Sequence, residues 1–374
     1  MTKRSTWVVV GALASLMLFA SACGRGATSG PAVNSAPSHA ANPTTTTPNR
    51  VVPGSSGSPG GSPSSNSLQS VGTWSNGHRL DTNIRNDFMS ASCPTTTFCV
   101  MFDGSGLEFT YSNGTWSSGQ QINIKNQAAV ESVSCPTTTF CVAVDTGGYE
   151  FTYSGGTWSS GQGIDTSGNP DSVSCPTTTF CVAIDNGGYE FTYSNGTWSS
   201  GQQIDTSYQG LSSVSCPTTT FCVAVDGSGL EFTYSGSTWS SGQQININHD
   251  GEVESVSCPT TTFCVAVGSG GYEFTYSGST WSSGQQIDSY RFHNYRNIQL
   301  GADSVSCPTT TFCAAVFTNG YEFTYSGISW SSGQQIDSYS FHNNPNSLNS
   351  ISCPTTTFCI ASDNNGYQFT YGNG

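Results

Sequence analysis

The sequence predicts an all-β protein in which seven similar sheets close into a ring. Three observations support this prediction. The phrase SCPTTTFC occurs seven times at intervals of 40 to 49 residues, a period typical of repeat architectures. Short β-branched or aromatic runs fill each interval, as in strands. The repeats also begin with the strand that the last repeat lacks, which favours a ring over an open array.

Each repeat contains four short runs with the character of strands. In one unit, SVSC (132–135) and FCVAVD (140–145) are apolar or β-branched runs on either side of Pro-Thr-Thr-Thr. GYEFTYS (148–154) alternates aromatic and polar residues, and TWSSGQ (157–162) follows a Gly-rich turn. Gly and Asn supply the backbone conformations that tight hairpins need. The unit therefore predicts an antiparallel meander of four strands, named a to d in chain order.

Two cysteines flank every a–b turn and predict one disulfide within each unit. Opposed residues of an antiparallel pair lie about 4.5–5.5 Å apart at Cα, within disulfide range. A zinc site is the competing interpretation, but the five-residue gap is wide for zinc and no histidine recurs with the cysteines, so we expect no metal and no cofactor. The expected pairs are Cys93–Cys99, Cys135–Cys141, Cys175–Cys181, Cys216–Cys222, Cys258–Cys264, Cys307–Cys313 and Cys353–Cys359.

The two ends of the repeat region fit together. The last unit stops at GYQFTYGNG (366–374), after strand c, and the first repeat residues, VGTWSNGHRLD (71–81), form a strand d without its unit. A linear solenoid would need capping repeats, whereas a ring removes its exposed ends by such an offset. Residues 71–374 are therefore expected to close through the first strand. One tryptophan then falls in every unit: Trp74, Trp116, Trp158, Trp198, Trp239, Trp281 and Trp330.

This arrangement resembles the seven-bladed β-propellers of the WD40 and related families, which close their ring with a split blade. The likeness lies in the architecture of residues 71–374, because no WD dipeptide is present. The cysteine-bearing repeat looks like units of exported proteins from high-GC Gram-positive bacteria. AVDTGGYEF (143–151) is similar to the Asp box of sialidase-type propellers, although Ala143 replaces the expected hydroxyl residue. The Asp box is a folding element in those families, so it does not imply sialidase activity.

The N-terminal region predicts export. Residues 1–22 have the basic start, apolar run and small residues of a signal peptide. Ala20-Ser21-Ala22-Cys23 resembles a bacterial lipobox, so we expect lipidation at Cys23, the one cysteine left after seven pairs. The alternative is an A-x-A cleavage site that releases the protein. Residues 23–70, rich in Pro, Ser, Thr and Gly, are expected to be a disordered linker. The predicted location is the outer face of the cell membrane, or the medium.

The charge balance excludes one class of partner. The formal net charge is −14, and the repeat region holds five cationic residues. A surface that follows a phosphate backbone cannot be built from so few, so we expect no nucleic acid partner. We expect a monomer that contacts the membrane through its lipid anchor only. The five cations are Arg79, Arg85, Lys125, Arg291 and Arg296.

The order of strands also predicts where the acidic residues gather. Because the strands alternate in direction, the b–c turns and the d–a connections share one face of the ring, and the a–b and c–d turns share the other. The aspartates fall on the first of these faces. They are Asp103, Asp145, Asp185, Asp226 and Asp363 in b–c turns, and Asp81, Asp165, Asp205, Asp288 and Asp337 after strand d, with Asn123 and Asn246 in place of Asp in two units.

Symmetry is broken by two long d–a connections, which share the pattern IDSY-x-FHN. They lie in consecutive units and place aromatic residues, imidazoles and two of the five cations on the acidic face. Aromatic residues and Arg carry much of the energy of protein interfaces. The alternative is a recent duplication whose loops pack on each other. The predicted ligand-binding residues are Asp288, Tyr290, Arg291, Phe292, His293, Tyr295, Arg296, Asp337, Tyr339, Phe341 and His342.

The predicted function is a binding module at the cell envelope, with an envelope protein or a cell-wall glycan as its partner. The alternative is an enzyme, a glycosidase or lyase acting on cell-wall or extracellular carbohydrate. No catalytic residue is assigned, because no unrepeated pair of carboxylates or nucleophile with its base stands out. Six repeated glutamates of strand c and the seven tryptophans are interpreted as structural, although the tryptophans could also stack on sugars. The glutamates are Glu108, Glu150, Glu190, Glu231, Glu273 and Glu322.

Overall fold

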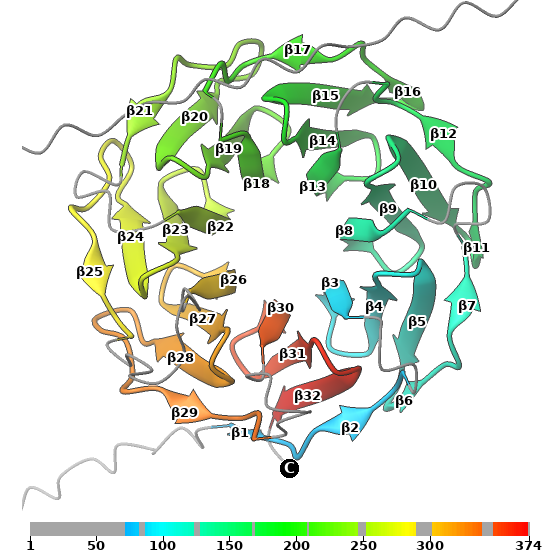
Figure 1. The fold of residues 1–374 in the computed structure, drawn as a ribbon, viewed down its shortest axis with the longest axis vertical. Helices are drawn as coiled ribbons and strands as arrows, with labels where there is room; N and C mark the ends of the chain where they lie inside the picture. The colour runs from blue at the N-terminus through cyan, green and yellow to red at the C-terminus, as the bar shows by residue number, and fades with distance from the viewer. Residues whose placement is uncertain are drawn as a thin grey trace, which may run out of the picture. The chain divides into compact units, whose positions relative to one another are not determined.

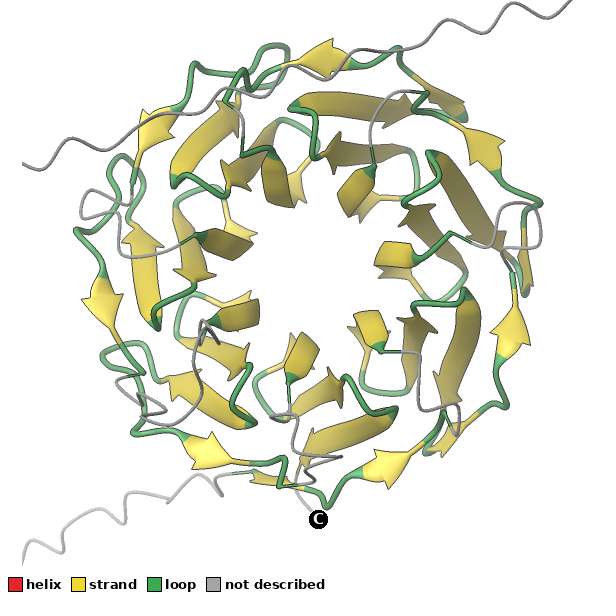
Figure 2. Cartoon of the chain, in the orientation of Figure 1, coloured by secondary structure: helices red, strands yellow, loops and turns green. Residues whose placement is uncertain are grey.

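The protein is a seven-bladed β-propeller. The structure is a computed structural model that describes residues 72–81, 87–122, 128–166, 169–207, 209–245, 252–288, 301–338 and 347–372. These residues form seven antiparallel sheets around a central axis, and each sheet runs from an inner to an outer strand (Figures 1 and 2). This confirms the predicted fold class. No helix in these ranges is long and apolar enough to cross a membrane.

The strands of each blade follow the chain from the axis outward (Figure 1). The inner strands, corresponding to a, are β3 (Phe88–Thr95), β8 (Val130–Thr137), β13 (Pro170–Thr177), β18 (Leu211–Thr218), β22 (Val253–Thr260), β26 (Ala302–Thr309) and β30 (Leu348–Thr355). The second strands are β4 (Phe98–Asp103), β9 (Phe140–Asp145), β14 (Phe180–Asp185), β19 (Phe221–Asp226), β23 (Phe263–Gly268), β27 (Phe312–Phe317) and β31 (Phe358–Asp363).

The third strands are β5 (Leu107–Ser112), β10 (Tyr149–Ser154), β15 (Tyr189–Ser194), β20 (Leu230–Tyr234), β24 (Tyr272–Tyr276), β28 (Tyr321–Tyr325) and β32 (Tyr367–Gly372). The outer segments are β1 (Thr73–Trp74), β2 (His78–Arg79), β6 (Thr115–Trp116), β7 (Gln120–Gln121), β11 (Thr157–Trp158), β12 (Gln162–Gly163), β16 (Thr197–Trp198), β17 (Gln202–Gln203), β21 (Gln243–Gln244), β25 (Gln285–Gln286) and β29 (Gln334–Gln335).

Strand d is divided, which the sequence did not predict. In the blade of β8–β12, Ser159 interrupts the outer strand: the Thr152 N–H donates to Ser159 Oγ at 3.0 Å, and the Ser159 N–H donates to the Thr152 carbonyl at 2.8 Å. The Ser159 hydroxyl therefore accepts a hydrogen bond that a backbone carbonyl of the outer strand would otherwise accept. A Cβ on Gly161 would lie 2.7 Å from the Phe151 ring, so glycine lets the outer strand pass over it. These contacts explain the first serine and the glycine of the repeated Ser-Ser-Gly.

The ring closes through the first strand of the described chain, as predicted. Both β1 and β2 pair antiparallel with β32, the third strand of the last blade. Trp74 lies opposite Tyr371, and Arg79 lies opposite Tyr367. The segment of 72–80 thus supplies the outer strand that the C-terminal repeat lacks (Figure 1).

The hydrophobic core is divided among the seven junctions between blades. At one junction, Val100 and Phe102 of β4 pack with Val130 of β8 and with the ring of Trp158. The centroids of Phe102 and Trp158 are 5.2 Å apart with an edge-on geometry. The structural interpretation of the tryptophans is therefore confirmed for this position: the ring fills the wedge between neighbouring sheets.

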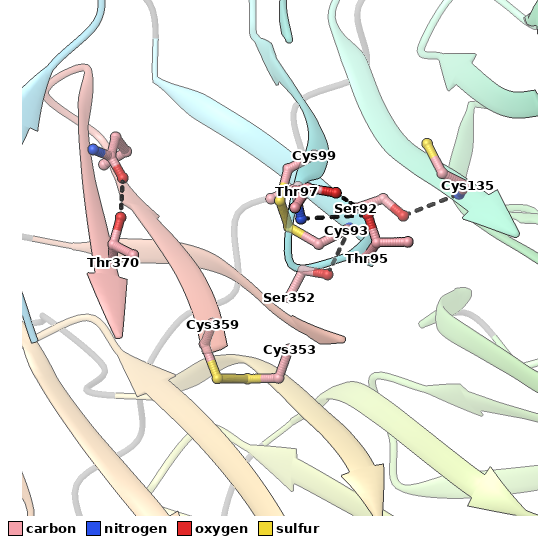
Figure 3. Close-up of a disulfide and its surroundings, with 12 residues drawn as sticks. Ser92, Cys93, Thr95, Thr97, Cys99, Cys135, Ser352, Cys353, Cys359 and Thr370 are labelled. Atoms are coloured by element: carbon pink, nitrogen blue, oxygen red, sulfur yellow. Dashed lines mark hydrogen bonds between the residues drawn. A yellow bond between two sulfur atoms is a disulfide. The ribbon is translucent and has the colours of Figure 1, made fainter. Parts of the chain in front are cut away.

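All seven predicted disulfides are present, one in each blade. Cys93–Cys99 and Cys353–Cys359 are seen in Figure 3, each bridging the hairpin between the inner and second strands. Their Cα atoms are 4.1 Å apart. The remaining pairs follow the predicted pattern.

Serine side chains join each inner strand to the next blade. The Cys135 N–H donates to Ser92 Oγ at 2.9 Å, and the corresponding bond from Cys93 to Ser352 closes the ring (Figure 3). A second serine on each strand accepts in the same way, for example from the Val133 N–H to Ser90 Oγ at 3.1 Å. An inner strand is an edge, and these bonds satisfy N–H groups that no neighbouring strand reaches.

Candidate functional site

The two faces of the ring are built from the predicted turns. In the blade of β8–β12, the Asp165 N–H donates to the Gly148 carbonyl and the Thr146 N–H donates to Ala129, so the b–c turn contacts the segments on both sides of it. On the opposite face, the Asn113 N–H donates to the Thr97 carbonyl and joins the c–d and a–b turns. Asn113 has φ 49°, a conformation that suits an Asn-Gly hairpin turn.

The aspartates of the predicted acidic face are buried. Asp145 ends β9, is fully buried, and accepts from the N–H groups of Gly147 and Tyr149, both at 2.9 Å. It therefore holds the b–c turn, the folding role that the Asp box resemblance implies. The aspartates that follow strand d are at most 7% exposed: they are Asp81, Asp165, Asp205, Asp288 and Asp337.

Most of these aspartates meet a polar group of the next blade. Ser207 Oγ donates to Asp226, which ends β19 of the following blade, at 2.9 Å, and also contacts Asp205 at 2.8 Å. Asn319 Nδ2, from the b–c turn of the next blade, donates to Asp288 Oδ2 at 2.7 Å. The aspartates thus join blades on this face, while the serine bonds join them along the inner strands.

Two junctions place a carboxyl group against another carboxyl group. Asp185 faces Asp165 of the preceding blade, and Asp363 faces Asp337. Burial raises the pKa of Asp185 to about 6, against backbone N–H groups that lower it, and Asp165 raises it further. Burial likewise raises the pKa of Asp363 to about 6.

One position of the inner strand breaks the symmetry of the ring. We name it the inner-rim position; it is the second residue of every inner strand. The serines and cysteine that follow it repeat, but its own chemistry changes from blade to blade. Its residues are Met89, Glu131, Asp171, Ser212, Glu254, Asp303 and Asn349.

The inner-rim side chains reach from one inner strand to the next. Ser212 Oγ donates to the Val253 carbonyl at 2.8 Å, and Asn349 Nδ2 donates to the Phe88 carbonyl at 3.1 Å, in both cases on the following blade. These side chains are half-buried. The position therefore forms a nearly continuous rim around the axis, at the end of the blades where the d–a connections enter.

Four carboxyl groups lie on this rim. Burial raises the pKa of Asp171 to about 7, with further contributions from Glu131 of the preceding blade and from Asp185. Burial raises the pKa of Asp303 to about 8, although the Ser347 hydroxyl lowers it, and Glu254 of the preceding blade raises it again. Burial and Glu252 together raise the pKa of Glu254 to about 7.

The rim has no basic partner in the described ranges, where Arg79 is the single Lys or Arg. Arg79 lies on the outer segment β2, with its guanidinium 5.8 Å from the centre of the Tyr367 ring. Its Nε donates to the Asp81 carbonyl at 2.9 Å. The inner rim is consequently an arc of acidic groups that repel each other.

The repeated glutamates of strand c have a structural role, as predicted. Thr152 Oγ1 donates to Glu150 at 2.9 Å. Burial raises the pKa of Glu150, whereas this hydroxyl and the indole of Trp198 on the next blade lower it. The Trp198 nitrogen is buried and faces this carboxyl group without meeting the distance and angle limits of a hydrogen bond. The glutamates and tryptophans therefore act together between blades.

Only two residues of the predicted binding patch lie in the described ranges. Asp288 and Asp337 are buried between blades, where Asp288 accepts from Asn319. The others, Tyr290, Arg291, Phe292, His293, Tyr295, Arg296, Tyr339, Phe341 and His342, lie outside the described residues, as do Cys23 and the N-terminal regions 1–22 and 23–70. Within the described ranges, no three or more His, Cys, Asp and Glu side chains are grouped so as to hold a metal ion.

Sequence reasoning missed the inner-rim residues. The available signal was a change of residue class between units at the position directly before the first serine of the Ser-x-Ser-Cys pattern. Its meaning depends on which strand is innermost, which the repeat alone does not give.

No family model and no curated protein sequence matches the chain. Two solved structures of similar fold are described as YCF48 bound to D1 peptide and YCF48 from Cyanidioschyzon merolae. The first superposes with a TM-score of 0.61 at 13% identity over 80% of this chain and 97% of that chain. The second has a TM-score of 0.60 at 13% identity over 80% and 99%. At this identity the likeness shows the fold alone.

Proposed function

We propose that this propeller is a protein-binding module that recognises a basic polypeptide segment at its inner rim. The observation that carries the proposal is the inner-rim position, where residue chemistry varies while the preceding residue stays apolar and the serines and cysteine that follow repeat. A residue needed to build a blade is needed in every blade, as the serines and cysteines are. A side chain that differs between blades is free of that requirement, so it can serve recognition.

The charge of the rim indicates the chemistry of the partner. Glu131 and Asp171 are neighbours on consecutive blades, and Glu254 and Asp303 form a second such pair. Like charges held close together destabilise a fold. A Lys or Arg side chain of a partner would relieve this repulsion, and Ser212 and Asn349 add polar groups on the same rim.

The likeness to YCF48 supports a protein partner over a glycan. One of those structures is described as bound to a D1 peptide. That description concerns YCF48, and it supports a polypeptide as the class of partner in this proposal.

We extend the proposal to the two long connections. Residues 289–300 lead directly to β26, which carries Asp303, and residues 339–346 lead to β30, which carries Asn349. The aromatic residues predicted to bind a partner therefore precede inner-rim residues by 8 to 13 positions in the chain. In this proposal they form the outer part of the same surface, with Asp288 and Asp337 anchoring the connections from inside.

We further propose that the protein is exported and anchored through a lipid on Cys23. Seven disulfides support an oxidising compartment, because such bonds are rare in reducing ones. Labelling cells with an alkyne fatty acid should mark the wild-type protein but not a Cys23→Ser variant. Equal labelling of both proteins would contradict the lipid anchor.

The binding proposal is tested with arrays of peptides and glycans probed with the full exported protein. We expect binding to Lys- or Arg-bearing peptides, a loss of at least tenfold in affinity for a Glu131→Gln/Asp171→Asn variant, and weaker binding as salt rises. Glu150→Gln, a buried change in the same blade as Glu131, is the matched control and should bind normally. Binding to glycans alone, or equal affinity of the rim variant and wild type, would contradict the proposal.

A further inference from the structure

At two blade junctions of the described residues, a buried carboxyl group directly faces a carboxyl group of the preceding blade. One pair joins Asp165, after β12, to Asp185, at the end of β14; the other joins Asp337, after β29, to Asp363, at the end of β31. Asp185 and Asp363 are completely buried. Each pair contains one residue from each of two consecutive blades. An interaction between the two carboxyl groups therefore also joins the two blades.

The two oxygens of Asp185 have different surroundings. Its Oδ1 accepts from the N–H groups of Gly187 at 2.9 Å and Tyr189 at 2.7 Å, while its Oδ2 is buried without a hydrogen-bond partner. Asp363 repeats this arrangement: Oδ1 accepts from two backbone N–H groups and Oδ2 has no partner. In each pair, one buried oxygen thus lacks a donor, although another carboxyl group lies within reach.

Other junctions of the same molecule supply the missing hydrogen from a neutral side chain. The Ser207 hydroxyl lies between Asp205 and Asp226 and donates its single hydrogen to one of them, and the Asn319 amide donates to Asp288. At the other two junctions, no described side chain donates a hydrogen bond to Asp185 Oδ2 or to Asp363 Oδ2. A hydrogen bond between two carboxyl groups requires that one of them be protonated.

Burial favours the protonated form of Asp185 and of Asp363, and Asp165 favours it further at Asp185, whereas Asp337 and Asn365 lower the pKa of Asp363. Asp185 is faced by Asp165 and by Asp171 of the inner rim, which is itself beside Glu131. Asp363 is faced by Asp337 and by the neutral Asn365. No Lys, Arg or His of the described residues acts on either group. Their surroundings are therefore apolar, neutral or acidic.

We propose that each pair holds one shared proton that joins neighbouring blades, and that release of the two protons loosens these junctions as the pH rises. The pairs form a pH-sensitive device built into the ring. This inference is independent of the proposed ligand, because it concerns contacts between blades of the free protein.

The direction of the effect follows from proton linkage. Burial raises the pKa of Asp185 and Asp363 to about 6, above the value of about 4 for an unfolded chain. Between these values the folded protein binds more protons than the unfolded chain, so its stability falls as the pH rises. The contribution is fully present below the unfolded pKa and is lost as the pH passes the folded pKa near 6.

Thermal unfolding of the full chain between pH 4.5 and 8.5 tests the inference. An Asp185→Asn/Asp363→Asn variant carries an amide that can donate as Asn319 does, so it should melt at a higher temperature than wild type at pH 8 and show a smaller fall of Tm with pH. Asp226→Asn is the control, because Ser207 already donates at that junction, and it should keep the wild-type pH slope. The inner-rim carboxyls add to the slope of every protein, so the difference between variants is the readout.

Infrared difference spectra give a second measurement. The wild type minus the double variant should contain a protonated-carboxyl band that is lost as the pH rises from 5 to 7. Absence of that band, or an unchanged pH slope in the double variant, would overturn the inference. A rise of Tm at pH 8 on adding calcium that the double variant lacks would also overturn it, because a cation would then be the group that joins the carboxyls.

Discussion

At the scale of single residues, the two serines of each inner strand connect the blades. Cys175 of β13 donates its backbone N–H to Ser134 of the preceding blade at 2.9 Å, and the same bond recurs at every junction, including the closing one. Serine is suited to this place because its short side chain reaches the neighbouring backbone and its oxygen accepts two hydrogen bonds. The Ser-x-Ser-Cys pattern therefore repeats because the serines of each blade bond to the next blade.

Replacing one of these serines should destabilise the ring. Ser134→Ala leaves the Cys175 N–H buried without an acceptor, which costs about 1–3 kcal/mol. The free energy of unfolding in urea measures the loss. Ser160→Ala changes an exposed serine of the same blade and should have an effect below about 0.5 kcal/mol. Equal stability of the two variants would show that the serine bond does not hold the blades together.

At the scale of elements, the repeat predicted what is local and missed what is not. The strand order, the hairpins and the cysteine pairs follow from residues close in sequence, and all were confirmed. The division of strand d depends on Ser159 and Gly161 meeting strand c, and the burial of Asp185 depends on the preceding blade. The distance between two such residues along the sequence does not indicate whether their side chains face each other in the fold.

The candidate site follows the same rule. The acidic residues were correctly assigned to one face, but the sequence did not show that Asp288 and Asp337 are buried. The inner rim was missed because Glu131 and Asp171 lie 40 residues apart in the chain and become neighbours only when two inner strands stand side by side. The strand register, rather than the residue types, brings them together.

The disulfides should stabilise hairpins individually. Removing one with Cys135→Ala/Cys141→Ala opens a loop of seven residues, and the chain-entropy model gives a loss of about 2–2.5 kcal/mol, to which lost packing of two buried side chains adds. Urea unfolding measures the loss, with Cys23→Ser as the control that leaves every blade intact. Peptide mapping without reduction should find each cysteine paired within its own blade, and links between blades would contradict this arrangement.

At the scale of the whole molecule, stability is distributed around a closed ring. The core lies in seven clusters between neighbouring blades, so every blade depends on two others. Trp74 packs beside Ala314 and Val316 of the preceding blade and thereby completes the last junction. Closure is consequently a structural requirement of the last blade.

Deletion of residues 72–80 should open the ring. It would expose the edge of β32 and the apolar groups at the last junction, and exposed edges associate. We expect a lower melting temperature and a shift to larger species in size-exclusion chromatography. Deletion of residues 55–63, which has the same length, is the control and should leave both properties unchanged. A monomeric 72–80 deletion with the wild-type melting temperature would show that closure contributes nothing.

The claim that a polypeptide binds the inner rim is tested most directly by site-specific photo-crosslinking. A photoreactive amino acid is placed at Ser212 on the inner rim and, in a separate protein, at Gln203 on the outer segment β17. Each protein is irradiated with a Lys/Arg-bearing peptide selected by the full chain, and the products are mapped by mass spectrometry. The account predicts a crosslink from position 212 that excess unlabelled peptide abolishes, and none from position 203. A crosslink from position 203 with none from 212 would contradict it.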